Sequence, residues 1–197
     1  MRERTTPTRR ESLATMLFVG LGASSIVQNA HAQQVDGRAR VLVAYFSRSG
    51  NTRLVAGHVR RALGAHLFEI QPAQAYPEDY DATVSQAQRE QETAVEPALK
   101  ETVSSMDAYE TIFLGFPIWG MTTPPVIRSF LARHDLAGKS IVPLITHGGY
   151  GTGQSLSVVA SSAPRARLRE GFTLQMDQER EILRRVTRWL GTVKGRS

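Results

Sequence analysis

Short apolar runs alternate with amphipathic stretches along most of the chain, and this alternation predicts strands separated by helices. The clearest run, residues 41–46 (VLVAYF), is apolar at nearly every position, which is typical of a parallel strand buried on both faces. Four more strands are predicted at residues 65–70, 109–115, 139–146 and 166–174. The pattern therefore predicts an α/β fold, a doubly wound three-layer α/β/α sandwich around a five-stranded parallel sheet.

Apolar residues recur at helical spacing between these runs. After the first strand we expect a helix that ends at Gly64, with one apolar face formed by Val55, Val59, Ala62 and Leu63. Further helices are predicted over residues 83–92, 124–134, 154–162 and 179–191. The first of these four is polar almost throughout, so we assign it a solvated surface and no chemistry.

Two details of the pattern give sharper predictions. Pro143 lies within the fourth strand and has no N–H to donate to a neighbouring strand, which predicts a local bulge. The last helix is expected to bury five apolar side chains, those of Ile182, Leu183, Val186, Trp189 and Leu190.

The first 32 residues differ from the rest of the chain. Arg9 and Arg10 lie in the sequence TRRESL, which resembles a twin-arginine export motif, and an uncharged stretch over residues 13–27 follows it. Ala30, His31 and Ala32 then form a potential cleavage site. We expect an export signal at residues 1–32, cleaved near Ala32, and a periplasmic mature protein.

The remaining boundaries follow from this assignment: a linker at residues 33–39, one folded domain at 40–191 and a tail at 192–197. The alternative for the leader is a retained membrane anchor. Its apolar stretch is shorter than the ~20 residues that span a bilayer, so we expect cleavage and no transmembrane span afterwards.

Charge and composition narrow the possible functions. The leader holds four arginines and two glutamates of the 24 basic and 18 acidic residues, so the remainder has a net charge of about +4. Its arginines are scattered without interleaved aromatics, which does not favour a nucleic-acid partner. The chain has no cysteine, which excludes disulfides, thiolate catalysis and cysteine-based metal sites. Any redox chemistry must therefore come from a bound cofactor.

Three further histidines, His58, His66 and His134, lie on separate predicted elements and lack the spacing of paired metal ligands. We expect them to be structural or surface residues and predict no metal site.

The first strand leads directly into a loop rich in hydroxyl groups. Ser47, Ser49 and Thr52 offer hydroxyl donors, Gly50 permits a positive φ, and a helix N-terminus follows. The loop has neither the Lys of a P-loop nor a G-x-G-x-x-G motif, so nucleotide hydrolysis is not favoured. On these residues alone, a phosphate site and an ordinary capped connection both stay open.

Two more loops should meet at the same edge of the sheet, after the third and fourth strands. Trp119 lies in a loop beside Gly120, and we expect it to stack on a flat ligand because the loop offers no core to fill. The loop at 147–153 holds four glycines and offers Tyr150 as a second stacking group. His147 has two open roles, a donor to the ligand or a side chain bonded to backbone.

Three motifs together, YFSRSGNT at 45–52, LGFPIWG at 114–120 and THGGYGTG at 146–153, resemble the flavodoxin family, and the resemblance covers residues 40–191. It implies the strand order 2-1-3-4-5 and FMN as the cofactor. The implied phosphate site is Ser47, Arg48, Ser49, Gly50, Asn51 and Thr52. The implied flavin-ring site is Pro117, Ile118, Trp119, Gly120, Met121, Thr146, His147, Gly148, Gly149, Tyr150 and Gly151.

In such proteins the flavin performs the redox step, and we assign no catalytic residue beyond a tuning role for Trp119, Gly120 and His147. Three functions stay open: an FMN-dependent oxidoreductase that reduces a quinone or similar small acceptor, a one-electron carrier that docks with redox proteins, and a flavin-binding protein without turnover. The positive net charge differs from the acidic surface of typical carrier flavodoxins. The sequence names neither the electron donor nor the acceptor.

Overall fold

The computed structural model describes residues 40–175 and 179–194. The predicted leader, its cleavage site and the linker lie outside the described residues, as do the last three residues of the tail and the side chain of Ile182.

Strands and helices alternate along the described chain as the hydrophobic pattern predicts. In chain order they are β1 (Val41–Tyr45), α1 (Asn51–Leu63), β2 (His66–Glu69), α2 (Tyr80–Glu92), the short 3₁₀ helix η2 (Met106–Ala108), β3 (Thr111–Pro117), α3 (Pro125–Arg133), β4 (Ser140–His147), α4 (Ser155–Ser162), β5 (Arg167–Leu168), β6 (Phe172–Gln175) and α5 (Glu179–Lys194).

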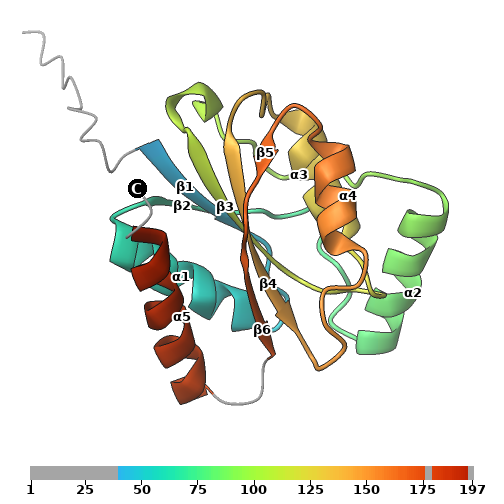
Figure 1. Cartoon of the computed structure of the whole chain (residues 1–197). Helices are drawn as coiled ribbons and strands as arrows, with labels where there is room; N and C mark the ends of the chain where they lie inside the picture. Colours follow the sequence, from blue (N-terminus) through green and yellow to red (C-terminus); the bar gives the residue numbers. More distant parts are fainter. Residues whose placement is uncertain (1–39, 176–178, 195–197) are drawn as a thin grey trace, which may run out of the picture. The chain divides into compact units, whose positions relative to one another are not determined.

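These strands form one parallel sheet in the order β2-β1-β3-β4-β5, with β6 also paired to β4. Figure 1 shows α1 and α5 on one face of the sheet and α2, α3 and α4 on the other. The predicted doubly wound sandwich with strand order 2-1-3-4-5 is therefore confirmed. The fifth strand position is shared by two short segments, β5 and β6.

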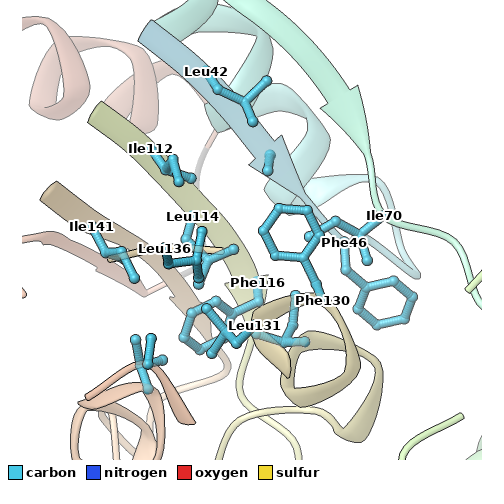
Figure 2. Close-up of a cluster of buried hydrophobic side chains, with 14 of the residues drawn as sticks. Leu42, Phe46, Ile70, Ile112, Leu114, Phe116, Phe130, Leu131, Leu136 and Ile141 are labelled. Atoms are coloured by element: carbon cyan, nitrogen blue, oxygen red, sulfur yellow. The ribbon is translucent and has the colours of Figure 1, made fainter. Parts of the chain in front are cut away.

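Strand β1 is buried on both faces, as its continuous apolar sequence predicts. Leu42, Ala44 and Phe46 face a core cluster beneath α3 and α4, part of which is drawn in Figure 2. Val43 and Tyr45 face a second cluster beneath α1 and α5. Burial on both faces places β1 in the interior of the sheet and brings the loop that follows it to the centre of one edge.

Helix α5 only partly matches its prediction. Val186 and Leu190 are buried, and Trp189 packs against Phe113 and Phe172 with ring centroids 6.1 and 5.2 Å apart. The prediction that Leu183 is buried is wrong, because 39% of it is exposed. The described α5 side chains that join the second cluster begin at Val186, so Leu183 lies before the part of the helix that packs against the sheet.

The predicted bulge at Pro143 is also wrong, because β4 pairs with β3 without interruption. Successive residues of β4 bond to opposite neighbours: Ser140 donates its N–H to Glu110 O on the β3 side, and Ile141 O accepts from Arg169 N–H on the other. By this alternation Pro143 faces the β5 and β6 side. It lies opposite the gap between those two segments, where no ladder bond requires its N–H.

The backbone of Gly171 lies so close to Pro143 that there is room for the glycine hydrogen but not for a side chain. A Cβ at this position would lie 2.3 Å from Pro143 O and 2.9 Å from its Cδ. We expect Gly171→Ala to push β6 away from β4 and to lower the free energy of unfolding by about 1 to 3 kcal/mol. Gly191→Ala is the control, because a Cβ on Gly191 meets nothing within 4 Å and alanine favours the helix. Chemical denaturation should show the first variant destabilised and the second stabilised; equal effects would contradict the close contact.

No helix within the described ranges is both long enough and apolar enough to cross a membrane.

Candidate functional site

The three predicted site loops follow β1, β3 and β4, which are neighbours in the sheet. The chain runs from β1 outward to β2 on one side and crosses to β3 on the other. This reversal is a topological switch point, where doubly wound sheets bind ligands beyond the carboxyl ends of their strands.

Direct hydrogen bonds join the three loops. Thr52, in the first turn of α1, lies with its hydroxyl oxygen 2.8 Å from that of Thr146 at the end of β4. Ile118 N–H donates to Thr146 O at 2.9 Å, and Gln154 N–H donates to Met121 O at 2.9 Å. The fold therefore brings the sequence-predicted segments 47–52, 117–121 and 146–151 to one edge.

The first loop has the geometry of an anion site. Ser47 Oγ accepts from Gly50 N–H at 3.1 Å, and Gly50 takes a φ of 91° as the N-cap of α1. The first intrahelical bond from this loop runs from Leu54 N–H to Gly50 O at 3.0 Å, so the N–H groups of residues 51–53 have no acceptor within the helix. These donors and the positive end of the helix dipole favour a phosphate there.

Thr52 lies beneath this loop and is only 1% exposed. Its methyl group packs near Gly115, where a Cβ would approach Thr52 Cγ2 to 3.2 Å. The Thr52 and Thr146 hydroxyls are hydrogen-bonded to each other. When Thr146 is the donor of this bond, the Thr52 O–H is left to donate a hydrogen bond to an anion.

Arg48 bends away from the anion site. Its Nη2 donates to Glu78 O at 2.5 Å, and its Cζ lies 5.8 Å from the ring centroid of Tyr80. Arg48 therefore links the first loop to the segment before α2, and neutral donors line the site itself.

A cavity of about 540 Å³, here called the loop cavity, joins the first two loops. Its size falls in the range of small-molecule sites. The loops contribute Arg48, Ser49, Pro117, Ile118, Trp119 and Gly120. The opposite wall is one face of α2, formed by Tyr80, Thr83, Val84, Ala87, Gln88 and Gln91. Residues 147–151 of the third loop do not line this cavity.

The sequence analysis missed the contribution of α2, to which it assigned a solvated surface and no chemistry. Thr83 and Ala87 are buried, and Gln91 donates from its Nε2 to Trp119 O at 3.4 Å. A signal was present, because Tyr80, Val84, Ala87 and Gln91 recur at the spacing of one helical face. This face has few large apolar residues, so its pattern is hard to distinguish from the polar residues around it.

Trp119 has protein partners, so the expectation that it has no core to fill is wrong. Its ring meets those of Phe46 and Tyr76 edge-on, with centroids 5.2 and 4.9 Å apart. The partner that sequence reasoning could not supply is Tyr76, from the irregular segment between β2 and α2. Trp119 also lines the loop cavity, so it belongs to both the aromatic cluster and the candidate site.

Tyr76 is fixed in turn by α2. Its hydroxyl donates to Glu90 Oε2 at 2.8 Å, and Gln86 Nε2 donates to Glu90 Oε1 at 2.8 Å. Burial, followed by the bond to Glu90, raises the pKa of Tyr76 well above its ordinary value, so the phenol keeps its proton. The aromatic cluster of Phe46, Tyr76 and Trp119 is thereby tied to the helix that forms the cavity wall.

In the third loop, His147 Nδ1 accepts from Gly149 N–H at 3.1 Å and from Gly151 N–H at 3.3 Å. Both partners are donors, so Nδ1 carries no proton in this arrangement. Of the two roles left open by the sequence, the structure shows the backbone-bonded one. Tyr150 is 83% exposed.

The three other histidines in the described part of the chain also have protein partners. His58 Nε2 lies 2.9 Å from Thr187 Oγ1, and His66 Nδ1 lies 2.7 Å from the Tyr109 hydroxyl. His134 Nε2 accepts from Val103 N–H at 2.9 Å. Among the described residues, no group of three or more His, Asp or Glu side chains is placed to hold a metal.

The packing of Trp119 gives a testable expectation. Trp119→Ala should lower the free energy of unfolding by about 2 kcal/mol, because two edge-on aromatic contacts and buried apolar area are lost. Tyr150→Ala is the matched control in a neighbouring loop and should change stability by less than about 0.5 kcal/mol, since Tyr150 is largely in water. Urea denaturation measures both; a stable Trp119→Ala variant would contradict the packing described here.

Comparison with known proteins agrees with this architecture. The flavodoxin family model matches residues 40–193. A provisionally named flavoprotein from Bacteroides eggerthii is 32% identical, with a TM-score of 0.67 over 79% of this chain and 98% of that one. A similarly named protein from Bacteroides uniformis is 30% identical, with a TM-score of 0.68 over 78% and 98%.

A more distant structure has the same fold. It is a flavoprotein from Lactobacillus acidophilus in complex with FMN, 17% identical, with a TM-score of 0.63 over 68% of this chain and 93% of that one. No curated protein matches the chain by sequence. The family match covers most of the chain, and all the described strands of the sheet lie within it. The chain belongs to the flavodoxin family.

Proposed function

We propose that this protein binds FMN and acts as an oxidoreductase that reduces a quinone or a similar small acceptor. The observation that carries the proposal is the loop cavity, which joins a phosphate-type loop to an aromatic-lined loop at the switch point of the sheet. Family membership supports it, as does the FMN complex of the Lactobacillus acidophilus protein.

The residues present fit the phosphate of FMN. The N–H groups of residues 51–53 lack intrahelical acceptors, and Ser49 and Thr52 add hydroxyl groups next to them. These neutral donors would hold a phosphate dianion by charge-assisted hydrogen bonds. Asn51 begins the helix, and Gly50 leaves open space above the turn, since a Cβ there meets nothing within 4 Å.

The flavin ring would lie against the second loop, where Pro117, Ile118 and Trp119 offer apolar surface and Gly120 allows close approach. We keep Met121, Thr146 and residues 147–151 in the proposed ring site, because hydrogen bonds connect the second and third loops directly. On the opposite wall, the amides of Gln88 and Gln91 provide hydrogen-bond donors and acceptors for a polar edge.

Bound FMN supplies the transfer of electrons, and the chain supplies binding, orientation and the exclusion of water. Reduction of a small acceptor is favoured over protein-to-protein transfer by the net charge of about +4 outside the leader and by the partly apolar cavity beside the loops. A molecule the size of a quinone ring is small enough to approach such a site directly.

The test is an electron balance on the FMN-loaded full chain. Candidate donors are added while the visible absorbance of the flavin is followed, and a soluble naphthoquinone or oxidised cytochrome c is then supplied. We expect reduction followed by saturable, repeated turnover of the quinone. Turnover of cytochrome c without quinone reduction would favour the one-electron carrier, and a flavin that no donor reduces would favour binding without turnover.

We also propose that the protein is exported after FMN has bound. The support is the TRRESL sequence, which resembles a twin-arginine export motif. The resemblance implies a pathway that carries folded proteins, so FMN can be bound before export. Replacing both Arg9 and Arg10 by Lys should keep the protein in the cytoplasm with its leader uncleaved. Cell fractionation and the N-terminal sequence of the product measure this, and unchanged export of the double variant would indicate another route.

A further inference from the structure

A second cavity lies on the other side of the first loop, between the carboxyl ends of β1 and β2. Its volume is about 660 Å³, and we call it the β2-side cavity. Its most buried lining residues are Phe46 and Ile70, which are 7% and 0% exposed, and Pro72 and Tyr76 add flat apolar surface. None of these residues was assigned a role by the sequence analysis, and the cavity lies outside the proposed flavin-ring site.

The outer wall of this cavity is held by a short antiparallel pairing. Lys100 N–H donates to Gln71 O at 2.9 Å, and Ala73 N–H donates to Ala98 O at 2.7 Å, on either side of the bridge between Pro72 and Leu99. Backbone bonds therefore fix the position of Lys100 at the rim, so the cavity is a preformed feature of the fold.

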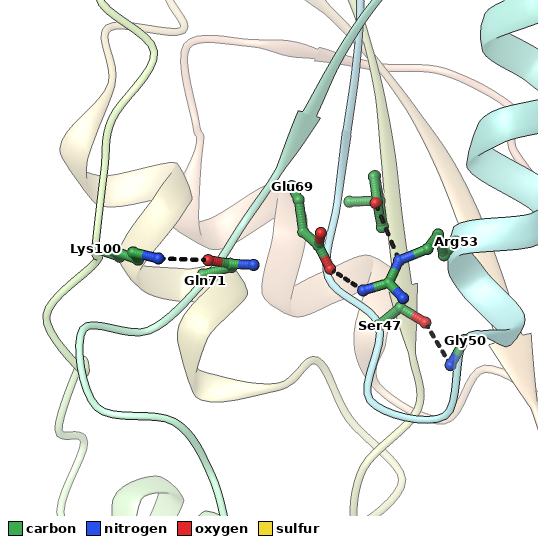
Figure 3. Close-up of polar contacts among 7 residues, drawn as sticks. Ser47, Gly50, Arg53, Glu69, Gln71 and Lys100 are labelled. Carbon is green, nitrogen blue, oxygen red and sulfur yellow. Dashed lines mark hydrogen bonds and ion pairs between the residues drawn. The ribbon is translucent and has the colours of Figure 1, made fainter.

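The rim is positively charged on balance. Figure 3 shows Lys100 with Gln71 on one side and Arg53 with Glu69 on the other. Arg53 Nη2 lies 2.6 Å from Glu69 Oε1, so these two charges offset each other. Lys100 Nζ donates only to a neutral amide oxygen, that of Gln71 at 3.5 Å, among the contacts of the described residues.

Two other charged residues complete the rim. Arg48 donates to the main-chain oxygen of Glu78, a neutral acceptor, while the Glu78 carboxylate is the remaining acidic group that lines the cavity. The cations thus outnumber the carboxylates by one. Lys100 and Arg48 both lack a carboxylate partner in the described structure, but Arg48 is already held by the main chain of Glu78 and the ring of Tyr80, which leaves Lys100 to meet an anion.

An aromatic wall separates this cavity from the loop cavity. Phe46 and Tyr76 line the β2-side cavity, Trp119 lines the loop cavity, and the Trp119 ring meets both of the others edge-on at about 5 Å between centroids. The two cavities share Arg48, and Ser47 also lines the β2-side cavity, but these rings separate their apolar parts, so we expect both cavities to be filled at the same time.

We propose that the β2-side cavity binds a flat aromatic molecule that carries one anionic group, such as a carboxylate. The rings would lie against Phe46, Ile70 and Tyr76, and the anionic group would face Lys100 at the rim. This site goes beyond the proposed flavin site and does not require that FMN binds.

The test uses 2-naphthoate as the anionic probe and 2-naphthamide as its neutral counterpart, titrated calorimetrically into the full chain with and without FMN. Lys100→Gln should weaken naphthoate binding by about three- to fivefold, as expected for an exposed ion pair, and leave naphthamide unchanged. Ala73→Trp should weaken both probes by narrowing the cavity. Val84→Trp is the matched control in the loop cavity and should leave both probes unaffected.

Amide NMR shifts locate the probe independently of any variant. We expect naphthoate to shift residues 70–78 and 98–100, with FMN present or absent. Shifts confined to residues 80–91 and 117–120, competition with FMN, or equal loss of both probes in Lys100→Gln would overturn the proposal. Failure of FMN to bind would remove the proposed function but leave these binding measurements intact, so the two failures are distinguishable.

Discussion

Replacing Ser49 by Ala together with Thr52 by Val is expected to weaken FMN binding by about 3 to 6 kcal/mol, more than roughly 100-fold, while riboflavin binding changes little. The reason is that each hydroxyl next to the unbonded N–H groups of residues 51–53 can donate a charge-assisted hydrogen bond to phosphate. Riboflavin lacks the phosphate and therefore does not use these donors. Fluorescence titration of both ligands into the variant measures the difference.

Thr146→Val is the matched control for this variant. It removes the partner of the Thr52 hydroxyl without removing a donor from the first loop. Because Thr146 belongs to the proposed ring site, any effect of this change should fall on FMN and riboflavin alike, unlike that of the double variant. If the double variant weakened FMN and riboflavin equally, the first loop would not hold the phosphate.

Gly153→Ala is expected to weaken FMN binding by about 3 kcal/mol, or roughly 100-fold, through the contact between the second and third loops. A Cβ on Gly153 would lie 1.9 Å from Met121 O and 2.7 Å from Met121 C, both backbone atoms that cannot rotate away. The φ of Gly153 is also positive, at 51°. We therefore expect the two loops to separate, with loss of the bond from Gln154 N–H to Met121 O.

Gly151→Ala separates the steric effect from the backbone effect. Gly151 has a φ of 75°, but a Cβ there meets nothing within 4 Å. The free energy of unfolding of this variant should fall by only about 1 to 2 kcal/mol, which is the cost of a positive φ for a residue with a Cβ. Equal FMN affinities of the two alanine variants would show that the close approach of Gly153 to Met121 does not support the site.

Several parts of the fold could be predicted because their signal is local. The continuous apolar sequence of β1 predicts burial on both faces, and its side chains do alternate between two core clusters. Gly64 ends α1 with a φ of 62°, in agreement with its position after the last apolar residue. The three site loops could also be placed at one edge, because parallel strands end on the same side.

The parts that were missed depend on segments far apart in sequence. Trp119 gains a partner from Tyr76, which lies in a stretch without periodicity, so no pattern linked the two residues. The bulge expected at Pro143 is absent because the neighbouring strand is interrupted there and Gly171 fits against it. Helix α2 was assigned to the solvated surface because the face that lines the loop cavity has few large apolar residues, and its hydrogen bond to the second loop comes from the polar side chain of Gln91.

Calorimetric titration of the full chain with FMN and with riboflavin tests the central claim most directly. We predict one FMN per chain, bound at least about 100-fold more tightly than riboflavin, since the phosphate adds charge-assisted hydrogen bonds at the start of α1. Protein that binds no FMN, or that binds FMN and riboflavin with equal affinity, would contradict the phosphate site and the FMN-dependent function built on it.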